Sequence, residues 1–144
     1  MSQSFRVLCL TLFLAAAATS PARADSKSGE AKFTGPRKEK VAVELGNKLK
    51  LKAEFQMIEV GRLAAISVNA KIKNTSSARM YYSYNVAFFD KDKNLIGCHC
   101  VPLQIGANGD STAGTFIQLP RDEIAKIAYY SVAFHESDKQ IGTK

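Results

Sequence analysis

Two cysteines separated by one histidine, Cys98-His99-Cys100, are the residues of this chain whose types and spacing could support chemistry. Side chains alternate between the two faces of a β-strand, so both thiols would lie on one face and His99 on the other. Their Cα atoms would be about 6.6 Å apart, near the outer limit for a disulfide. A disulfide formed there would be strained and readily reduced, as redox-active disulfides are.

Other interpretations of the thiol pair are open. As soft thiolates the cysteines could bind Cu(I) or Zn, with Met57, Met80 or His135 as further donors. They could also form disulfides between molecules. The pattern favours a structural role, in which both cysteines are small buried core residues beside Ile96.

The remaining residues provide no catalytic constellation. The chain has two histidines, His99 and His135, and His135-Glu136 is not a catalytic constellation because no nucleophile lies beside it. It lacks a G-x-S-x-G elbow, a phosphate-binding loop, a dinucleotide fingerprint and zinc-finger spacing. The sequence therefore predicts no enzyme activity, no catalytic residue, no metal site with a recognisable motif and no cofactor.

One segment imitates the start of a calcium-binding loop, with Asp90, Asp92 and Asn94 at alternate positions. An EF-hand loop needs Gly at position six and Glu at position twelve, where this chain has Leu95 and Val101. A polar hairpin turn explains these residues better.

Tyrosine is the second candidate for function, because exposed Tyr is common in contact surfaces. Alternation sends some of the five tyrosines outward, and Tyr81 and Tyr129 are the predicted contact residues. The alternative is cross-strand aromatic pairing that stabilises neighbouring strands. The sequence predicts a protein or an envelope polymer as the partner.

Lysines line one face of two predicted strands: Lys48, Lys50 and Lys52, and Lys71 and Lys73. A stripe of this kind can bind an anionic polymer, but no aromatic residues are interspersed with it as nucleic-acid binding would favour. We therefore expect a solvated face that protects the sheet from edge pairing, and no nucleic-acid partner.

The elements that must position these residues are strands, because apolar and polar residues alternate from Val41 onward. Pro120 and the acidic residues after it predict one short helical turn. About seven antiparallel strands predict an all-β, immunoglobulin-like sandwich, with a small β-barrel as the alternative. The predicted strands cover residues 41–45, 49–57, 64–73, 80–90, 95–100, 112–119 and 127–135.

The central strand has two possible buried faces. Val86 and Phe88 share one face, which we expect to pack with Val132 and Phe134 in the core. The other face carries Tyr81, Asn85 and Phe89, and a slip of one residue would bury that set instead.

Part of the chain resembles a known family. The segment Ala70-Lys71-Ile72-Lys73-Asn74-Thr75-Ser76, followed by Val86-Ala87-Phe88-Phe89-Asp90 and a turn, resembles the FxLYD-type domains of exported bacterial proteins. Val86, Phe88 and Phe89 stand where the family name has Phe, Leu and Tyr. The resemblance, over about residues 49–142, implies an immunoglobulin-like sandwich that serves as a non-catalytic accessory domain of the envelope.

The N-terminus predicts export. Arg6 precedes an apolar run over residues 7–18, and Ala22-Arg23-Ala24 fits a signal-peptidase site. The run is too short to span a bilayer, so no transmembrane segment is expected after processing. The predicted organisation is a signal peptide over 1–24, a flexible polar lead-in over 25–40 and a sandwich domain over 41–144, in the periplasm or secreted.

Cleavage after Ala24 would leave 120 residues, enough for one domain with a substantial core. Two of the 20 basic residues, Arg6 and Arg23, would be removed, which leaves a net charge of +5 against 13 acidic residues. This mild basic excess favours solubility and does not bear on the fold.

Overall fold

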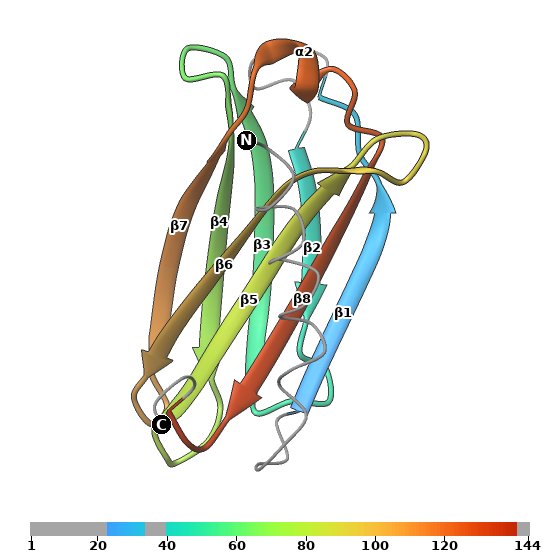
Figure 1. Cartoon of the computed structure of the whole chain (residues 1–144). Coiled ribbons are helices and arrows are strands. Elements are labelled where there is room, and N and C mark those ends of the chain that lie inside the picture. The colour runs from blue at the N-terminus through green and yellow to red at the C-terminus, as the bar shows by residue number, and fades with distance from the viewer. Residues whose placement is uncertain (1–22, 34–39, 141–144) are drawn as a thin grey trace.

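The computed structural model describes residues 23–33 and 40–140, where eight strands form two antiparallel sheets that pack face to face (Figure 1). Sheet A has the strand order β1-β8-β5-β6, and sheet B has the order β2-β3-β4-β7. A short helix, α2, spans Arg121–Ile124 before the last strand. The strands are β1 (Arg23–Glu30), β2 (Lys40–Leu45), β3 (Leu51–Val60), β4 (Ala65–Asn74), β5 (Met80–Phe89), β6 (Leu95–Ile105), β7 (Asp110–Gln118) and β8 (Tyr129–Ser137).

The predicted all-β sandwich is confirmed, with one strand more than the sequence pattern indicated. The additional strand is β1, which lies in the segment expected to be a flexible lead-in. It pairs with β8 along its whole length, from Arg23 opposite Glu136 to Glu30 opposite Tyr129. Backbone hydrogen bonds to β8 hold β1 at the sheet edge. Because this pairing uses main-chain groups, it does not require alternating apolar side chains, and the sequence of β1 shows no such alternation.

The predicted signal peptide lies outside the described residues up to position 22, and so do residues 34–39 of the lead-in. The predicted cleavage site after Ala24 falls at the start of β1. Cleavage there would remove Arg23 and Ala24 from the strand and leave the pairs from Asp25 onward in place.

Strand β6 continues beyond the predicted end at Cys100. It passes through Pro102 to Ile105 and forms an edge of sheet A. Proline lacks the N–H that an interior strand would need, so its presence agrees with an edge position.

The core lies between the sheets and is rich in aromatic residues. Val86 and Phe88 of β5 and Phe134 of β8 are fully buried, which confirms the predicted face of the central strand. Phe55 of sheet B meets the ring of Phe134 at 6.0 Å between centroids. Such edge-to-face contacts stabilise the core beyond the apolar area that they bury.

Two carboxylates of sheet A bind the connection between β2 and β3. Glu136, which is buried, accepts a hydrogen bond of 2.9 Å from the backbone N–H of Leu51. Asp25 accepts one of 2.7 Å from the N–H of Gly46. Gly46 has a φ of 95°, and a Cβ there would lie 2.2 Å from the carbonyl oxygen of Leu51, so this turn requires glycine.

Tyr84 carries the one buried side-chain polar atom in the described ranges that has no hydrogen-bond partner, its hydroxyl. Burial raises the pKa of Tyr84 to about 12, and the neighbouring Tyr82 contributes to the rise. The folded pKa therefore exceeds the unfolded value near 10, so the stability that depends on neutral Tyr84 is complete below about pH 10 and decreases as the pH rises toward 12.

We expect Tyr84→Phe to maintain or raise the free energy of unfolding by about 1 kcal/mol, because it removes a buried hydroxyl that has no partner. The variant should also lose less stability than the parent between about pH 8 and pH 11. Urea unfolding at the two pH values measures both effects. Tyr82→Phe is the matched control, since the Tyr82 hydroxyl lies 3.4 Å from Ser111 Oγ. A clear loss of stability in Tyr84→Phe at neutral pH would contradict the prediction.

Candidate functional site

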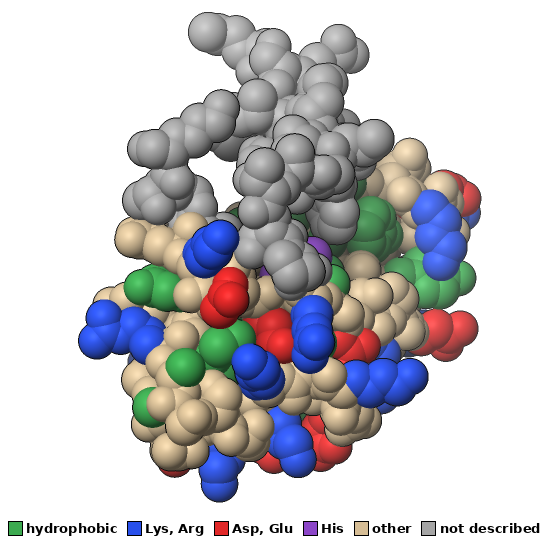
Figure 2. Space-filling model, turned by 90° about the horizontal axis from the view of Figure 1, so that it is seen from below, with side chains coloured by type: hydrophobic (Ala, Val, Ile, Leu, Met, Phe, Trp, Pro, Cys, Tyr) green, Lys and Arg blue, Asp and Glu red, His purple; other side chains and the backbone are tan. Residues whose placement is uncertain are grey.

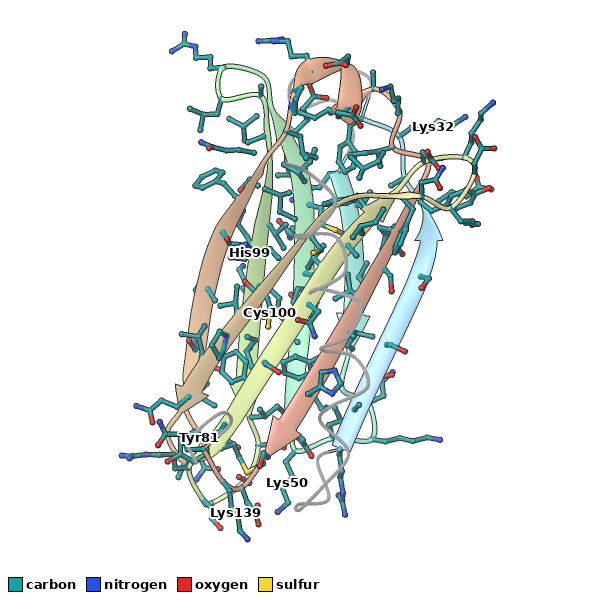
Figure 3. The ribbon with its side chains drawn as sticks, in the orientation of Figure 1. Lys32, Lys50, Tyr81, His99, Cys100 and Lys139 are labelled. Atoms are coloured by element: carbon teal, nitrogen blue, oxygen red, sulfur yellow. The ribbon has the colours of Figure 1, made fainter. Side chains whose placement is uncertain are left out.

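The four residues proposed for contact or thiol chemistry lie on one surface, the outer face of sheet A. Residues that pair directly across antiparallel strands share a face. Asn85 pairs with Cys100, and the inward neighbours of Asn85 on β5 are buried. By the same alternation Cys98, Tyr81 and Tyr129 lie on the outer face. Figure 3 shows Cys100 and His99 midway along β6, and Tyr81 near the lower end of sheet A.

A bulge in β6 determines which face carries the thiols. The pairing of β5 with β6 shifts between Phe88 and Phe89, which inserts Ile96 as an extra residue. Ile96 packs against the core, and in a regular strand Cys98, two residues later, would share its inward face. Because of the bulge, Cys98 instead lies opposite Ala87 on the outer face.

The interpretation of the cysteines as core residues is therefore wrong. Cys100 is exposed and Cys98 is half-buried, and neither belongs to the buried core. The structure holds them as two thiols and not as a disulfide. His99 pairs with Val86 and lies on the opposite face of β6 from both sulfur atoms.

The further metal donors suggested by the sequence do not gather around the thiols. Met57 and Met80 are buried between the sheets. His135 is on the outer face of sheet A but belongs to β8, which is separated from β6 by β5. Within residues 23–33 and 40–140, no three His, Cys, Asp or Glu residues form a group that could hold a metal ion.

The outer face of sheet A is almost free of charge. Among its positions on the described strands, the single acidic or basic residue is Glu30, at one end. Burial lowers the pKa of His135, which favours the neutral imidazole. The central part of the face consists of small or uncharged side chains: Ser26, Ser28, Ser83, Asn85, Ala87, Cys98, Cys100, Ser131, Ala133 and His135.

The outer face of sheet B has the opposite character. Cross-strand pairing places Glu54 beside Lys71 and Lys73 beside Asp110. The lysines predicted to form a solvated stripe thus sit among carboxylates, on a face that remains well hydrated. Figure 2 views the sandwich from the end where Lys50 and Lys139 lie (Figure 3), and it shows Lys and Arg side chains interspersed with Asp and Glu there as well.

Tyr81 and Tyr129 lie at opposite ends of the outer face of sheet A. Tyr129 pairs with Phe89, which is eight residues from Tyr81 along β5, so the two tyrosines are about 27 Å apart. The Nζ atom of Lys93 lies 2.9 Å from the centre of the Tyr129 ring, in a cation–π contact. Together with Glu30 and Phe89 these residues line an open recess of about 470 Å³.

The segment that imitates a calcium loop is a hydrogen-bonded turn. The Asp90 carboxylate accepts hydrogen bonds from the backbone N–H of Asp92 and of Asn94, both at 2.8 Å, and from Asn94 Nδ2 at 2.9 Å. The hydrogen bonds from Asn94 are the main cause of the lowered pKa of Asp90. Asp90 thus stabilises the β5–β6 connection by accepting these hydrogen bonds.

Sequence reasoning missed the small residues that make up most of this face. Ser131 and Ala133, for example, carry no chemical signature, and their place opposite Ala87 and Asn85 depends on the pairing of β8 with β5. A signal was present in β8, where the outward positions between Tyr129 and Ser137 contain no Asp, Glu, Lys or Arg.

Comparisons with known proteins give matches to solved structures at low identity. No protein-family model and no curated protein matches the sequence. A DUF1425 family member from Shewanella sp. pv-4 is similar at 9% identity and a TM-score of 0.44, over 81% of this chain and 99% of that one. A chain in the structure of infectious bursal disease virus Gx strain is similar at 13% identity and a TM-score of 0.43, over 88% of this chain and 28% of that one.

With TM-scores under 0.5, these matches carry no argument about fold or function. The FxLYD-type resemblance remains a prediction, and the class of protein that the structure defines is a two-sheet antiparallel β-sandwich. In the part of the chain that the structure describes, no helix has the length and apolar character needed to cross a membrane.

Proposed function

We propose that this protein is an exported, non-catalytic binding module of the cell envelope, and that it contacts a protein or an envelope polymer through the outer face of sheet A. The observation that supports the contact surface is the near absence of charge on that face. The signal-peptide pattern over residues 1–24 supports export.

The free energy of desolvation that a binding partner must overcome differs between the two outer faces. A partner on sheet B would have to desolvate charged residues such as Lys71 and Glu54, and an unpaired buried charge is strongly unfavourable. A partner on sheet A would cover hydroxyl, methyl and amide groups, which carry no net charge and can be satisfied by neutral hydrogen bonds. Charged residues are also depleted at the centre of known interfaces.

Asn85→Arg tests this surface. Asn85 is half-buried at the centre of the outer face of sheet A, between Cys100 and Ala133. We expect the arginine to abolish capture of a partner from envelope extracts, because its charge would be buried at the interface without a counter-charge. The measurement is a pull-down with the protein purified after expression from its full sequence.

Gln56→Arg is the matched control, because Gln56 is half-buried on the outer face of sheet B, between Ala42 and Asn69. It should capture the same partner as the parent protein, and both variants should melt cooperatively. Equal capture by the two variants, or loss only in Gln56→Arg, would disprove the assignment of the contact face. Turnover of a small molecule by the purified protein would disprove its non-catalytic character.

A second candidate function is thiol redox chemistry or copper handling by Cys98-His99-Cys100. The exposure of Cys100 and the position of both thiols on an outer face favour it, since reactive or metal-binding thiols must be accessible.

A further inference from the structure

Strand β7 forms one edge of sheet B, on the left of the sandwich in Figure 1. Just after β7, the N–H of Leu119 donates to the carbonyl oxygen of Ala64, and just before it the carbonyl oxygen of Gly109 accepts from Asn74. Alternate residues of an antiparallel strand direct their N–H and C=O groups to the same side. The odd-numbered residues of β7 therefore bond to β4, and the even-numbered ones point to the edge: Asp110, Thr112, Gly114, Phe116 and Gln118.

The other edge strands carry features that discourage pairing with a second chain, such as charges, proline, bulges or short length. β1 has four charged residues, β2 is six residues long, and β6 contains the bulge at Ile96 and Pro102. β7 pairs with β4 in unbroken register over nine residues, without proline, lysine or bulge, and Asp110 is its one charged residue. The lysines expected to protect the sheet from edge pairing lie elsewhere, since β3 and β4, which carry Lys52 and Lys71, are interior strands.

The sequence of β7 is complementary to itself about Gly114. If a second copy pairs antiparallel with Gly114 opposite Gly114, then Thr112 lies opposite Phe116. At the ends of the pair Asp110 lies opposite Gln118, so the two aspartates are far apart and no like charges meet. Every residue that points to the edge meets another that does so, and each can therefore donate one main-chain hydrogen bond and accept one.

Phe116 supplies an apolar contact for such a pair. It is 52% exposed on the outer face of sheet B. Its diagonal neighbour across the pair is Gly114 of the second copy, within reach of an aromatic ring. An aromatic ring that covers a glycine on the neighbouring strand stabilises the pairing of edge strands.

We propose that two copies of this protein associate through β7, antiparallel about Gly114, so that their B sheets join into one continuous sheet. Two-fold symmetry closes the assembly at a dimer, because each copy uses its one β7 edge. The interface goes beyond the proposed contact function and does not depend on it, since the outer face of sheet A stays uncovered in the dimer.

Sedimentation equilibrium over a concentration series tests the dimer, with protein purified after expression from its full sequence. The parent should dimerise. Gly114→Lys and Gly114→Glu should each stay monomeric where the parent is dimeric, because like charges then lie directly opposite each other at the two-fold axis. An equimolar mixture of the two variants should form a dimer with one copy of each, since the facing charges are then opposite.

Ala42→Lys is the matched control, because Ala42 is exposed on β2, the other edge strand of sheet B, and this variant should dimerise as the parent does. A Cβ at position 114 would lie 3.1 Å from Oδ1 of Asn69, an exposed side chain that can turn aside, so both Gly114 variants should fold. Thr112→Pro tests the edge without added charge. It removes an N–H that points to the edge, where proline is tolerated, and it should also abolish the dimer.

Several results would overturn the proposal: a parent that is monomeric throughout the series, dimers of Gly114→Lys or Thr112→Pro, or a mixture of the two folded Gly114 variants that stays monomeric. Loss of the dimer in Ala42→Lys would assign the interface to the opposite edge and overturn it as well. Thermal melts establish that each variant folds. The pull-down with Asn85→Arg reports separately on the contact function.

Discussion

Replacing Phe88 with alanine is expected to lower the free energy of unfolding by about 3–5 kcal/mol. Phe88 is fully buried on β5, and its ring meets that of Phe33 edge-to-face at 5.7 Å between centroids. The substitution removes these contacts and leaves a cavity between the two sheets. Since a domain is held together by roughly 5–15 kcal/mol, urea unfolding should show a large shift of the midpoint.

Phe89→Ala is the matched control, because Phe89 is the same residue type at the next position and lies on the outer face, only half-buried. We expect it to cost about 1 kcal/mol or less. If both variants lost similar stability, the assignment of the buried face of β5 would be wrong.

Asn74→Ala should destabilise the protein by about 2–4 kcal/mol, because several partly buried hydrogen bonds lose their partner together. Asn74 is fully buried at the end of β4. Its Nδ2 donates to the carbonyl oxygens of Ala78 at 2.7 Å and Gly106 at 2.8 Å. Its Oδ1 accepts from the backbone N–H and the hydroxyl of Ser76. One side chain thus joins the β4–β5 and β6–β7 connections.

Two further variants test the same hydrogen bonds, and chemical denaturation measures the free energy of unfolding of each. Asn74→Asp keeps the acceptor for Ser76 but places a carboxylate oxygen against the carbonyls of Ala78 and Gly106, so it should destabilise at least as much as alanine. Asn69→Ala, on the outer face of the same strand and exposed, should change stability by no more than about 0.5 kcal/mol. Near-parental stability in Asn74→Asp would mean that the two donated bonds contribute little.

Period-two alternation was sufficient to predict most of the fold. It located the core side of β5 at Val86 and Phe88, because strand side chains alternate whatever the tertiary context. It did not find β1, since an edge strand held by backbone pairing needs no apolar face. The resemblance included Asn74 in its motif, but the role of Asn74 became apparent only when the chain brought Gly106 to it.

The sequence by itself determined that Cys98 and Cys100 share one face of a strand and that Tyr81 lies on the opposite face of β5 from Phe88. The tertiary structure decided which face of β6 the thiols occupy. The apolar neighbour Ile96 favours burial of the cysteines, but the bulge at Ile96 shifts the pairing with β5 by one residue and turns them outward. Alternation is symmetric between the two faces of a strand, so only the pairing between strands can make this choice.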